Sequence, residues 1–189
     1  MYIHGYGSDG NATKGQLLRK MLPSHTVISP TFDYDNSTPW QIQDEIRHAI
    51  EDNDIKMIVG SSFGGYHSLC ATLFFHGIVW AINPVHEVET TIRRVILNNS
   101  SSSNNGKGQS FIDIYRDFNE KVFCKQVKLN QSGQWPKEDL LNFALSTDDE
   151  LLGDHRPLLD LFPTHNRVIW KDDSGHRFFR FEELKDDLL

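Results

Sequence analysis

Serine, aspartate and histidine follow one another along this chain at positions that suit one kind of chemistry. The candidates are Ser62, one of the pair Asp148 and Asp149, and His176. A serine hydroxyl becomes a good nucleophile when a neighbouring imidazole, whose pKa lies near neutrality, takes its proton. A carboxylate then fixes the imidazole tautomer and stabilises the imidazolium that forms. These residue types therefore predict attack by Ser62 on a carbonyl carbon.

Ser62 lies in a stretch that predicts a buried strand, a sharp turn and a helix. Gly60-Ser61-Ser62-Phe63-Gly64 fits the G-x-S-x-G pattern of a nucleophile elbow, and it precedes the apolar segment 69–75. The elbow brings the chain on either side of the serine into close approach, where only very small residues fit. Ser61 has the wrong spacing for the role. Gly/Ser-rich turns also bind phosphate or simply turn the chain, so the motif needs partners elsewhere.

The acid and the histidine follow two later strands. Asp148 and Asp149 come directly after the strand expected at 141–146, and His176 follows the strand expected at 167–170. Parallel sheets hold their sites at the carboxyl ends of the strands, so the three side chains should lie together. The chain order serine, acid, histidine is that of α/β-hydrolases. The alternative for His176 is an ordinary loop histidine, and the alternative for the acidic residues is a solvated turn. We expect at least two of the three acidic residues at 148–150 to be solvated.

Acyl transfer also needs two backbone N–H groups that bind the oxyanion. The amide of Phe63 directly follows the nucleophile and opens a helix, whose positive dipole end favours a negative charge. The second amide normally comes from the loop after the first central strand. Here that loop is His4-Gly5-Tyr6, so we assign the second group to Tyr6.

The same loop has a rival interpretation as a dinucleotide site. Gly5 to Gly10 formally matches G-x-G-x-x-G after a strand, and Asp33 follows a later expected strand, as a ribose-binding acid would. The preceding strand is short, however, and the next helix begins too late for the phosphate position. The dinucleotide interpretation would also leave the serine, the acid and the histidine unexplained.

Apolar runs of strand length alternate with helical patterns along most of the chain. Helices are expected at 13–22, 39–50, about 63–75, 155–161 and 178–189, and strands at 2–4, 26–29, 56–60, 77–82, 141–146 and 167–170. Continuous apolar strands that alternate with helices indicate a mostly parallel sheet covered on both faces. The expected fold is therefore a compact α/β-hydrolase with helices on both faces of the sheet.

The chain length fits one domain, 1–189, with an irregular segment inside it. Residues 85–138 form an expected insertion and partial lid over the edge of the sheet. Within it, 88–97 is expected to be helical, 98–108 reads as a polar low-complexity loop, and 111–129 is ambiguous between helix and hairpin. Five aromatic residues are candidates for an acyl pocket, although such residues more often belong to a core: Trp80, Tyr115, Phe118, Trp135 and Phe179.

Composition excludes several classes of protein. The net charge of −7 and the lack of a Lys/Arg cluster argue against a nucleic-acid partner. No apolar run approaches the roughly 20 residues that span a membrane, and no secretory signal is visible. Cys70 and Cys124 make no disulfide framework, so a cytoplasmic setting is expected. Nine histidines lack metal-ligand spacing, so neither metal nor cofactor is expected. The sequence carries no signal of oligomeric state.

Several segments together resemble the YqiA/YcfP-like small bacterial esterases over nearly the whole chain. They are residues 2–8, Gly60-Ser-Ser-Phe-Gly-Gly-Tyr66, Asn83-Pro84, Thr147-Asp-Asp-Glu-Leu-Leu152 and Gly175-His-Arg-Phe178. The resemblance implies a compact α/β-hydrolase with esterase activity on short acyl esters. Members of that family carry Thr-Gly-Asp-Glu at the acid turn, which places the catalytic carboxylate on Asp149. Asp148, which stands where the family has glycine, is the alternative acid.

The leading hypothesis is a serine esterase that acts on a small-molecule ester through an acyl-enzyme. Ser62 attacks, His176 moves the proton, Asp149 orients the imidazole, and the amides of Phe63 and Tyr6 hold the oxyanion. A thioesterase would use the same residues. A non-catalytic binding module on the same fold is the rival from another class, since a fold alone does not give an activity.

Overall fold

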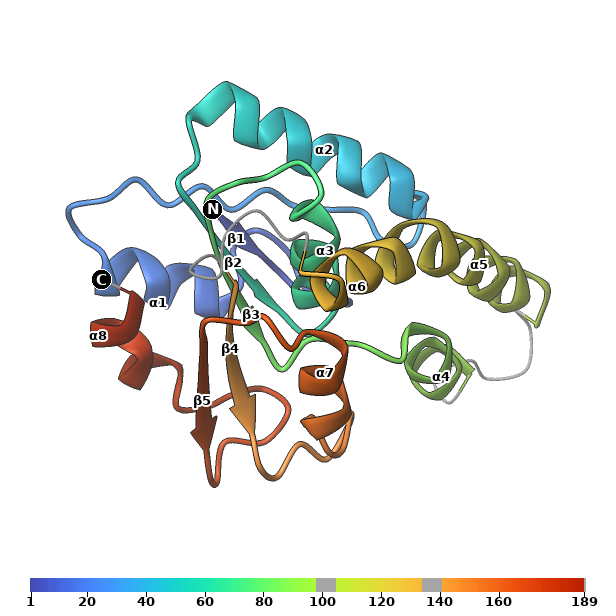
Figure 1. Ribbon diagram of the computed structural model, residues 1–189. Helices are drawn as coiled ribbons and strands as arrows, with labels where there is room; N and C mark the ends of the chain where they lie inside the picture. Colours follow the sequence, from blue (N-terminus) through green and yellow to red (C-terminus); the bar gives the residue numbers. More distant parts are fainter. Residues whose placement is uncertain (98–104, 134–140, 189) are drawn as a thin grey trace.

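Five parallel strands form the centre of the molecule. The computed structural model describes residues 1–97, 105–133 and 141–188. The strands are β1 (Tyr2–Ile3), β2 (Met57–Ser61), β3 (Ile78–Ile82), β4 (Leu141–Ser146) and β5 (Arg167–Lys171), and they lie side by side in that order (Figure 1). Each neighbouring pair is parallel, so all carboxyl ends meet at one edge. The expected α/β architecture is confirmed.

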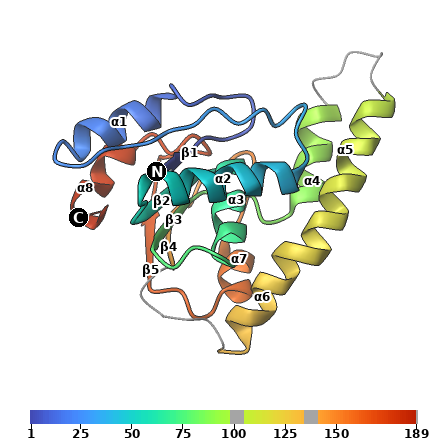
Figure 2. The same cartoon turned by 90° about the horizontal axis from the view of Figure 1, so that it is seen from above.

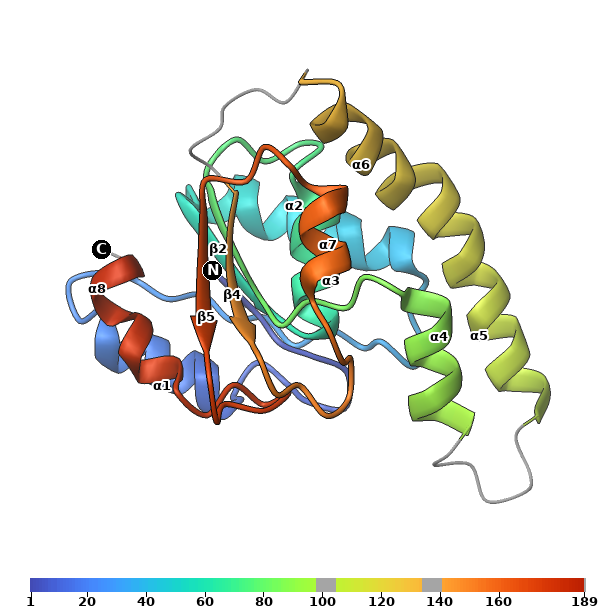
Figure 3. The same ribbon diagram turned by 60° about the horizontal axis from the view of Figure 1, so that its bottom comes forward.

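The sheet is buried on both faces, because successive side chains of a strand point to opposite sides. In β3, Val79 and Ala81 belong to one apolar cluster and Trp80 and Ile82 to another. Helices α1 (Thr13–Met21) and α8 (Lys185–Leu188) cover the second cluster, whereas α2 (Pro39–Asn53), α3 (Phe63–Ala71) and α7 (Arg156–Leu161) lie on the other face (Figure 3). Helices on both faces are therefore also confirmed.

Local signals explain where α2 begins and ends. The Thr38 side chain accepts the amide of Gln41, the Gln41 side chain accepts the amide of Thr38, and Pro39 fills the first helical position. Asp54, in a left-handed conformation, ends the helix. The helix therefore runs about one turn beyond the expected end near residue 50.

The strand expected at 26–29 is wrong. One backbone hydrogen bond, from the Tyr2 amide to the Ile28 carbonyl at 2.8 Å, ties this stretch to β1. The chain then meets Pro30, which has no amide hydrogen. The Gly10 backbone also lies against the Ser29 carbonyl, where a Cβ at Gly10 would come within 2.2 Å of that oxygen. A longer ladder has no room to form, so β1 is the outer strand of the sheet.

Between β3 and β4, the described residues form two helical stretches. The first is α4 (Val88–Ile92) with a π-helical turn at Arg93–Leu97. The second is α5 (Asn105–Phe118), a π-helical turn at Asn119–Phe123 and α6 (Cys124–Gln131), which form one long arm beside α3 (Figures 2 and 3). The ambiguous segment 111–129 is therefore helical. The loop expected at 98–108 is wrong for 105–108, and its remainder lies outside the described residues.

The final helix expected at 178–189 is broken. A 3-10 turn at Phe181–Leu184 and the short α8 take its place. Phe178 has a φ of 50°, and its amide and that of Phe179 close a turn on Gly175 and Ser174. This turn lets Phe178 pack with Phe181 in the cluster under α1, so packing overrides helix propensity here. Leu189 lies outside the described residues.

A buried histidine links three helices on the face of the sheet that α2 and α3 cover. Nδ1 of His67 lies 2.9 Å from Nε2 of Gln43 on α2, and its Nε2 lies 3.2 Å from the hydroxyl of Tyr115 on α5. His67 is fully buried. Burial disfavours the imidazolium and lowers the pKa of His67 to about 3.

The lowered pKa predicts a loss of stability in acid. Between about pH 6.5 and pH 3 the unfolded chain protonates His67 and the folded chain does not, so falling pH favours unfolding by up to about 1.4 kcal/mol per pH unit. In urea unfolding between pH 7.5 and 4.5, the stability advantage of wild type over His67→Gln should shrink as pH falls. His48→Gln, exposed on α2, is the control. A pH-independent advantage would contradict a neutral buried His67.

Candidate active site

Ser62 occupies a tight turn between β2 and α3. Its φ of 57° and ψ of −118° lie outside the regions that most residues adopt. The Ser62 amide donates to the Ile82 carbonyl at 2.9 Å, and its carbonyl accepts the amides of Tyr66 and Val85, both at 3.1 Å. Three backbone hydrogen bonds to β3, α3 and the loop after β3 thus hold the strained residue in place.

Two glycines make the turn possible by allowing backbone segments to touch. A Cβ at Gly60 would lie 2.0 Å from the Ser68 hydroxyl oxygen and 2.4 Å from the Gly64 carbonyl oxygen. A Cβ at Gly64 would lie 2.2 Å from the carbonyl oxygen of Ile3 in β1. These positions flank Ser62 by two residues on either side, where the elbow motif requires small residues.

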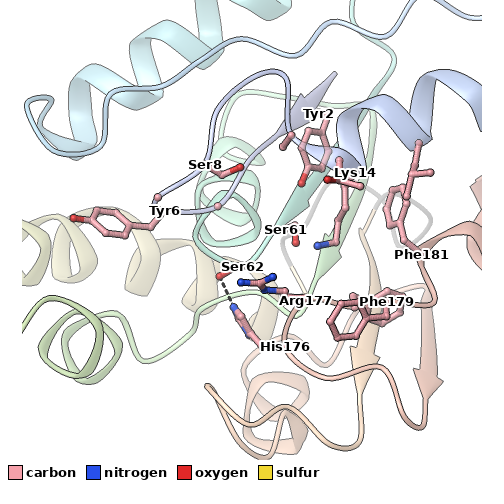
Figure 4. Close-up of a pocket in the computed structure, with 16 residues that line it drawn as sticks. Tyr2, Tyr6, Ser8, Lys14, Ser61, Ser62, His176, Arg177, Phe179 and Phe181 are labelled. Carbon is pink, nitrogen blue, oxygen red and sulfur yellow. Dashed lines mark hydrogen bonds between the residues drawn. The ribbon is translucent and has the colours of Figure 1, made fainter. Parts of the chain in front are cut away.

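The serine, the histidine and the second aspartate form a hydrogen-bonded chain. Ser62 Oγ lies 2.8 Å from His176 Nε2 (Figure 4). His176 Nδ1 lies 3.1 Å from Oδ1 and 3.0 Å from Oδ2 of Asp149. The Asp149 side chain is fully buried, and the His176 side chain is 13% exposed. The structure thus brings together the three residues that the sequence singles out, from the ends of β2, β4 and β5.

Asp149 is held by more than the imidazole of His176. Its Oδ1 accepts the amides of Leu151 at 3.0 Å and Leu152 at 2.7 Å, and its Oδ2 lies 2.9 Å from Nε2 of His155. Burial alone would raise the pKa of Asp149, but the hydrogen bonds from His155, His176 and Leu152 outweigh it and keep this pKa well below its usual value. The carboxylate is therefore ionised at neutral pH and fixed in orientation.

The other two acidic residues of the turn contact the backbone around His176. Asp148 Oδ1 accepts the amides of Ser174 at 3.1 Å and Gly175 at 3.0 Å, and Glu150 Oε2 accepts the amide of His176 at 2.8 Å. Asp148 and Glu150 are exposed, so the expectation that at least two of the three are solvated is confirmed, and both also accept amides of the loop backbone. Asp148, the alternative acid, shapes the loop, whereas Asp149 contacts the imidazole.

Two residues that position the acid and the histidine loop were not predicted from the sequence. His155 precedes α7 and is fully buried beside Asp149, so that carboxylate lies between two imidazoles. Asn83, after β3, has a φ of 39°, and its side chain donates to the carbonyls of Gly175 at 2.9 Å and His176 at 3.1 Å. In the sequence, Asn83-Pro84 is one of the segments that carry the family resemblance, with no role assigned to Asn83. No local pattern in the sequence assigns either residue this role.

The loop after β1 lies against the serine. A Cβ at Gly5 would come 3.3 Å from Ser62 Cβ, so this loop passes beside the nucleophile position. His4 anchors it, because the ring Nε2 accepts the Phe32 amide at 2.9 Å and the His4 carbonyl accepts the Tyr34 hydroxyl at 2.8 Å. Tyr6, from this loop, and Phe63, at the start of α3, line the same cavity beside Ser62.

The structure gives no support to the dinucleotide interpretation. Asp33 follows no strand, and its carboxylate accepts the amide of Asn36 at 3.2 Å in an exposed turn. Across 1–97, 105–133 and 141–188, no group of three or more His, Cys, Asp or Glu residues is placed to hold a metal ion. No helix in the described part of the chain is long and apolar enough to cross a membrane.

Two cavities meet at Ser62 and His176. The larger, of about 480 Å³, is bounded by the loop after β1, the start of α1 and the residues after His176, and we call it the cationic cavity because Lys14 and Arg177 line it (Figure 4). The smaller, of about 250 Å³, lies toward α4 and α5. We call it the apolar cavity, and its main apolar lining residues are Phe63, Val85, Ile92, Val95, Phe111 and Leu151.

The aromatic residues proposed for an acyl pocket are mostly elsewhere. Trp80, Tyr115 and Phe118 are buried in the two apolar clusters and line neither cavity. Phe179, 75% exposed, lines the cationic cavity. Trp135 lies outside the described residues. The apolar lining comes instead from Phe63 and from the helices between β3 and β4, because α5 buries its larger aromatic residues against α3.

Comparisons with known proteins agree with this geometry. The family described as "Uncharacterised protein family (UPF0227)" matches residues 1–188. Est1E from Butyrivibrio proteoclasticus superposes with a TM-score of 0.69 at 11% identity, covering 99% of this chain and 85% of that one. The monoacylglycerol lipase of Paleococcus ferrophilus gives a TM-score of 0.65 at 13% identity, with 99% and 90% covered.

An alpha/beta hydrolase enzyme from the metagenome of lagoon sediments at Mar Chica, Morocco, gives a TM-score of 0.62 at 12% identity, covering 99% of this chain and 86% of that one. At these identities the likeness establishes the fold, which is that of α/β-hydrolases. No curated protein sequence matches the chain.

The contacts at Gly64 predict a severe effect of adding one methyl group. Gly64→Ala would push a Cβ into the Ile3 and His4 carbonyl oxygens, so the free energy of unfolding should fall by about 2 kcal/mol or more. Gly15→Ala in α1 is the control. Its Cβ would come no closer than 3.2 Å to the side chains of Ser29 and Tyr2, and alanine favours a helix more than glycine does. Urea denaturation of both variants measures the difference. Equal stabilities would contradict the close approach at the elbow.

Proposed function

The chain belongs to the UPF0227 family, which is the YqiA/YcfP family, and we propose that it is a serine hydrolase that cleaves a carboxylic ester. One observation carries the proposal. Ser62 Oγ, the His176 imidazole and the Asp149 carboxylate form a continuous hydrogen-bonded chain at the carboxyl edge of the sheet, open to two cavities. The fold is one in which such a chain of residues performs acyl transfer.

In the proposed reaction His176 Nε2 takes the proton from Ser62 Oγ as that oxygen bonds to the ester carbonyl carbon. The carbonyl oxygen becomes an oxyanion, which the amides of Tyr6 and Phe63 bind. The bond to the alcohol oxygen then breaks, and His176 gives that oxygen its proton. Water, activated by the same imidazole, adds to the acyl-enzyme and releases the carboxylic acid.

Asp149 acts on His176 and not on the ester. Its ionised carboxylate accepts the Nδ1 proton and so leaves Nε2 free to accept the proton of Ser62. It also stabilises the imidazolium that forms in each half-reaction. His155 and the amides of Leu151 and Leu152 hold the carboxylate in the orientation that this task needs. The low pKa of Asp149 supports a charged acid across the neutral range.

The size of the apolar cavity supports a short hydrocarbon group on the substrate. Its volume is about 250 Å³, and α4 and α5 supply part of its wall through Ile92 and Phe111. We propose that the segment 85–138 belongs to the single domain and covers the site on this side. The same residues would cleave a thioester, and matched oxygen and thio esters of one acyl group would separate the two activities.

A non-catalytic binding module is the competing proposal. It would require a displaced histidine or a blocked approach to the serine. The 2.8 Å separation of Ser62 and His176, with two cavities opening beside them, supports catalysis instead.

Covalent labelling tests the nucleophile. A fluorophosphonate probe should label the wild-type protein on Ser62, because phosphonylation needs the same activated hydroxyl as acyl transfer. Ser62→Ala should not be labelled, and Ser61→Ala, one residue away, should be. Mass mapping of the modified peptide identifies the site. An unlabelled wild type that also leaves a panel of short acyl esters intact would exclude the hydrolase.

Paired substitutions test which aspartate is the acid. Asp149→Asn should lower kcat by about 10⁴-fold, because the amide favours the wrong imidazole tautomer. Asp148→Asn removes an acceptor of two loop amides but leaves the imidazole contact, so its loss should be far smaller. Steady-state kinetics on one short ester measures both. Equal losses, or the reverse order, would assign the acid differently.

A further inference from the structure

The cationic cavity carries charge that the proposed reaction does not use. Lys14 reaches it from α1 and Arg177 from the loop after β5, one residue beyond His176. Figure 4 shows both cationic groups directed into the space beside Ser62. A neutral short-chain ester would need neither of them.

Neither cation is neutralised within the described part of the chain. Some other lysines and arginines pair with carboxylates, as Arg180 and Lys171 do with Glu183. Lys14 and Arg177 form no ion pair with any described residue. What sets these two cations apart is that both line the cavity beside Ser62 and His176.

The proximity of Arg177 also disfavours the charged form of Lys14. Lys14 is half-buried, and burial together with the charge of Arg177 lowers the pKa of the Lys14 ammonium to about 8. An anion bound between them would relieve both effects. Arginine matches a carboxylate or a phosphate with two parallel N–H donors, and lysine adds a point charge.

We propose that the ester this protein hydrolyses is anionic, with a carboxylate or phosphate that Lys14 and Arg177 bind. The inference rests on the proposed hydrolase function and names its substrate class. The scissile carbonyl lies at Ser62, the anion lies in the cationic cavity, and a short hydrocarbon group occupies the apolar cavity. Because Ser62, His176 and Arg177 line the same cavity, the anion and the ester carbonyl share one continuous space.

This arrangement also explains how one serine can serve two unlike cavities. Tyr6, Ser62, His176 and Arg177 line both cavities, whereas Lys14 lines only the cationic one, so a substrate that spans them would carry its charge on the side of Lys14. The net charge of −7 does not favour anions, so recognition depends on the half-buried Lys14 and the exposed Arg177 that line the cavity.

Matched esters that differ only in charge provide the test. One pair places the charge on the alcohol side: 4-carboxyphenyl butyrate and 4-carbamoylphenyl butyrate. A second pair places it on the acyl side: monoethyl glutarate and its neutral amide, ethyl glutaramate. Hydrolysis followed by pH-stat gives the ratio of kcat/KM for the anionic over the neutral ester in each pair. Inhibition by glutarate and by phenyl phosphate separates a carboxylate site from a phosphate site.

In at least one pair, wild type should favour the anionic ester by about tenfold or more, as expected for charge-assisted hydrogen bonds. Lys14→Met and Arg177→Met should each lower that ratio by about tenfold. Lys20→Met, on the exposed side of the same helix, makes the same change in charge and should leave the ratio within twofold. A wild-type ratio at or below one in both pairs, or a ratio that neither cavity variant changes, would overturn the proposal.

The two proposals fail in different ways. If the fluorophosphonate labels Ser62 and no pair shows a preference for the anion, the anionic substrate is excluded and the hydrolase stands. If Ser62 is not labelled and no ester is cleaved, titration calorimetry on Ser62→Ala still decides the charge question. Tighter binding of 4-carboxyphenyl butyrate than of its carbamoyl analogue would support the anion site, and equal binding would exclude it.

Discussion

The site depends on close backbone contacts that only glycine allows, because glycine has no Cβ. β1, β2 and α3 converge around Ser62, with Gly60 and Gly64 placed where any side chain would overlap a backbone or hydroxyl oxygen. The convergence holds Ser62 at a positive φ, and so aims its hydroxyl away from the sheet and toward the loop after β5. The sheet around it supplies the burial that offsets the strain of this conformation.

The histidine is placed by a second set of contacts, which come from the ends of two other strands, β3 and β4. Asp148 and Glu150, after β4, accept amides of residues 174–176, and Asn83, after β3, donates to carbonyls of the same loop. Asp149 then needs only to orient the ring. Each of the three acidic residues has a separate task in one turn: Asp149 is buried beside the imidazole, and the exposed Asp148 and Glu150 hold the loop backbone. His155, buried behind Asp149, extends the arrangement inward.

Sequence patterns predict the parts of this structure that depend on local chemistry. The elbow at 60–64 was recognisable because one local turn requires both its glycines and its serine. The alternation of apolar strands with helices indicated the parallel sheet. The roles of Asn83 and His155 were not predictable, since Asn83 acts on a loop that meets it only in the folded chain and His155 reaches Asp149 only once the turn after β4 has formed. The false strand at 26–29 had the right residues but no room beside Gly10. Lys14 reads as an ordinary helix lysine until α1 is seen to pack beside the serine.

A crystal structure of the protein phosphonylated by a methyl fluorophosphonate would test the central claim most directly. The phosphorus should be bonded to Ser62 Oγ, with the phosphonyl oxygen within hydrogen-bond distance, about 2.7–3.1 Å, of the amide nitrogens of both Tyr6 and Phe63. His176 should remain between the adduct and Asp149. An adduct on another residue, or a phosphonyl oxygen directed away from both amides, would contradict the proposed acyl-transfer site.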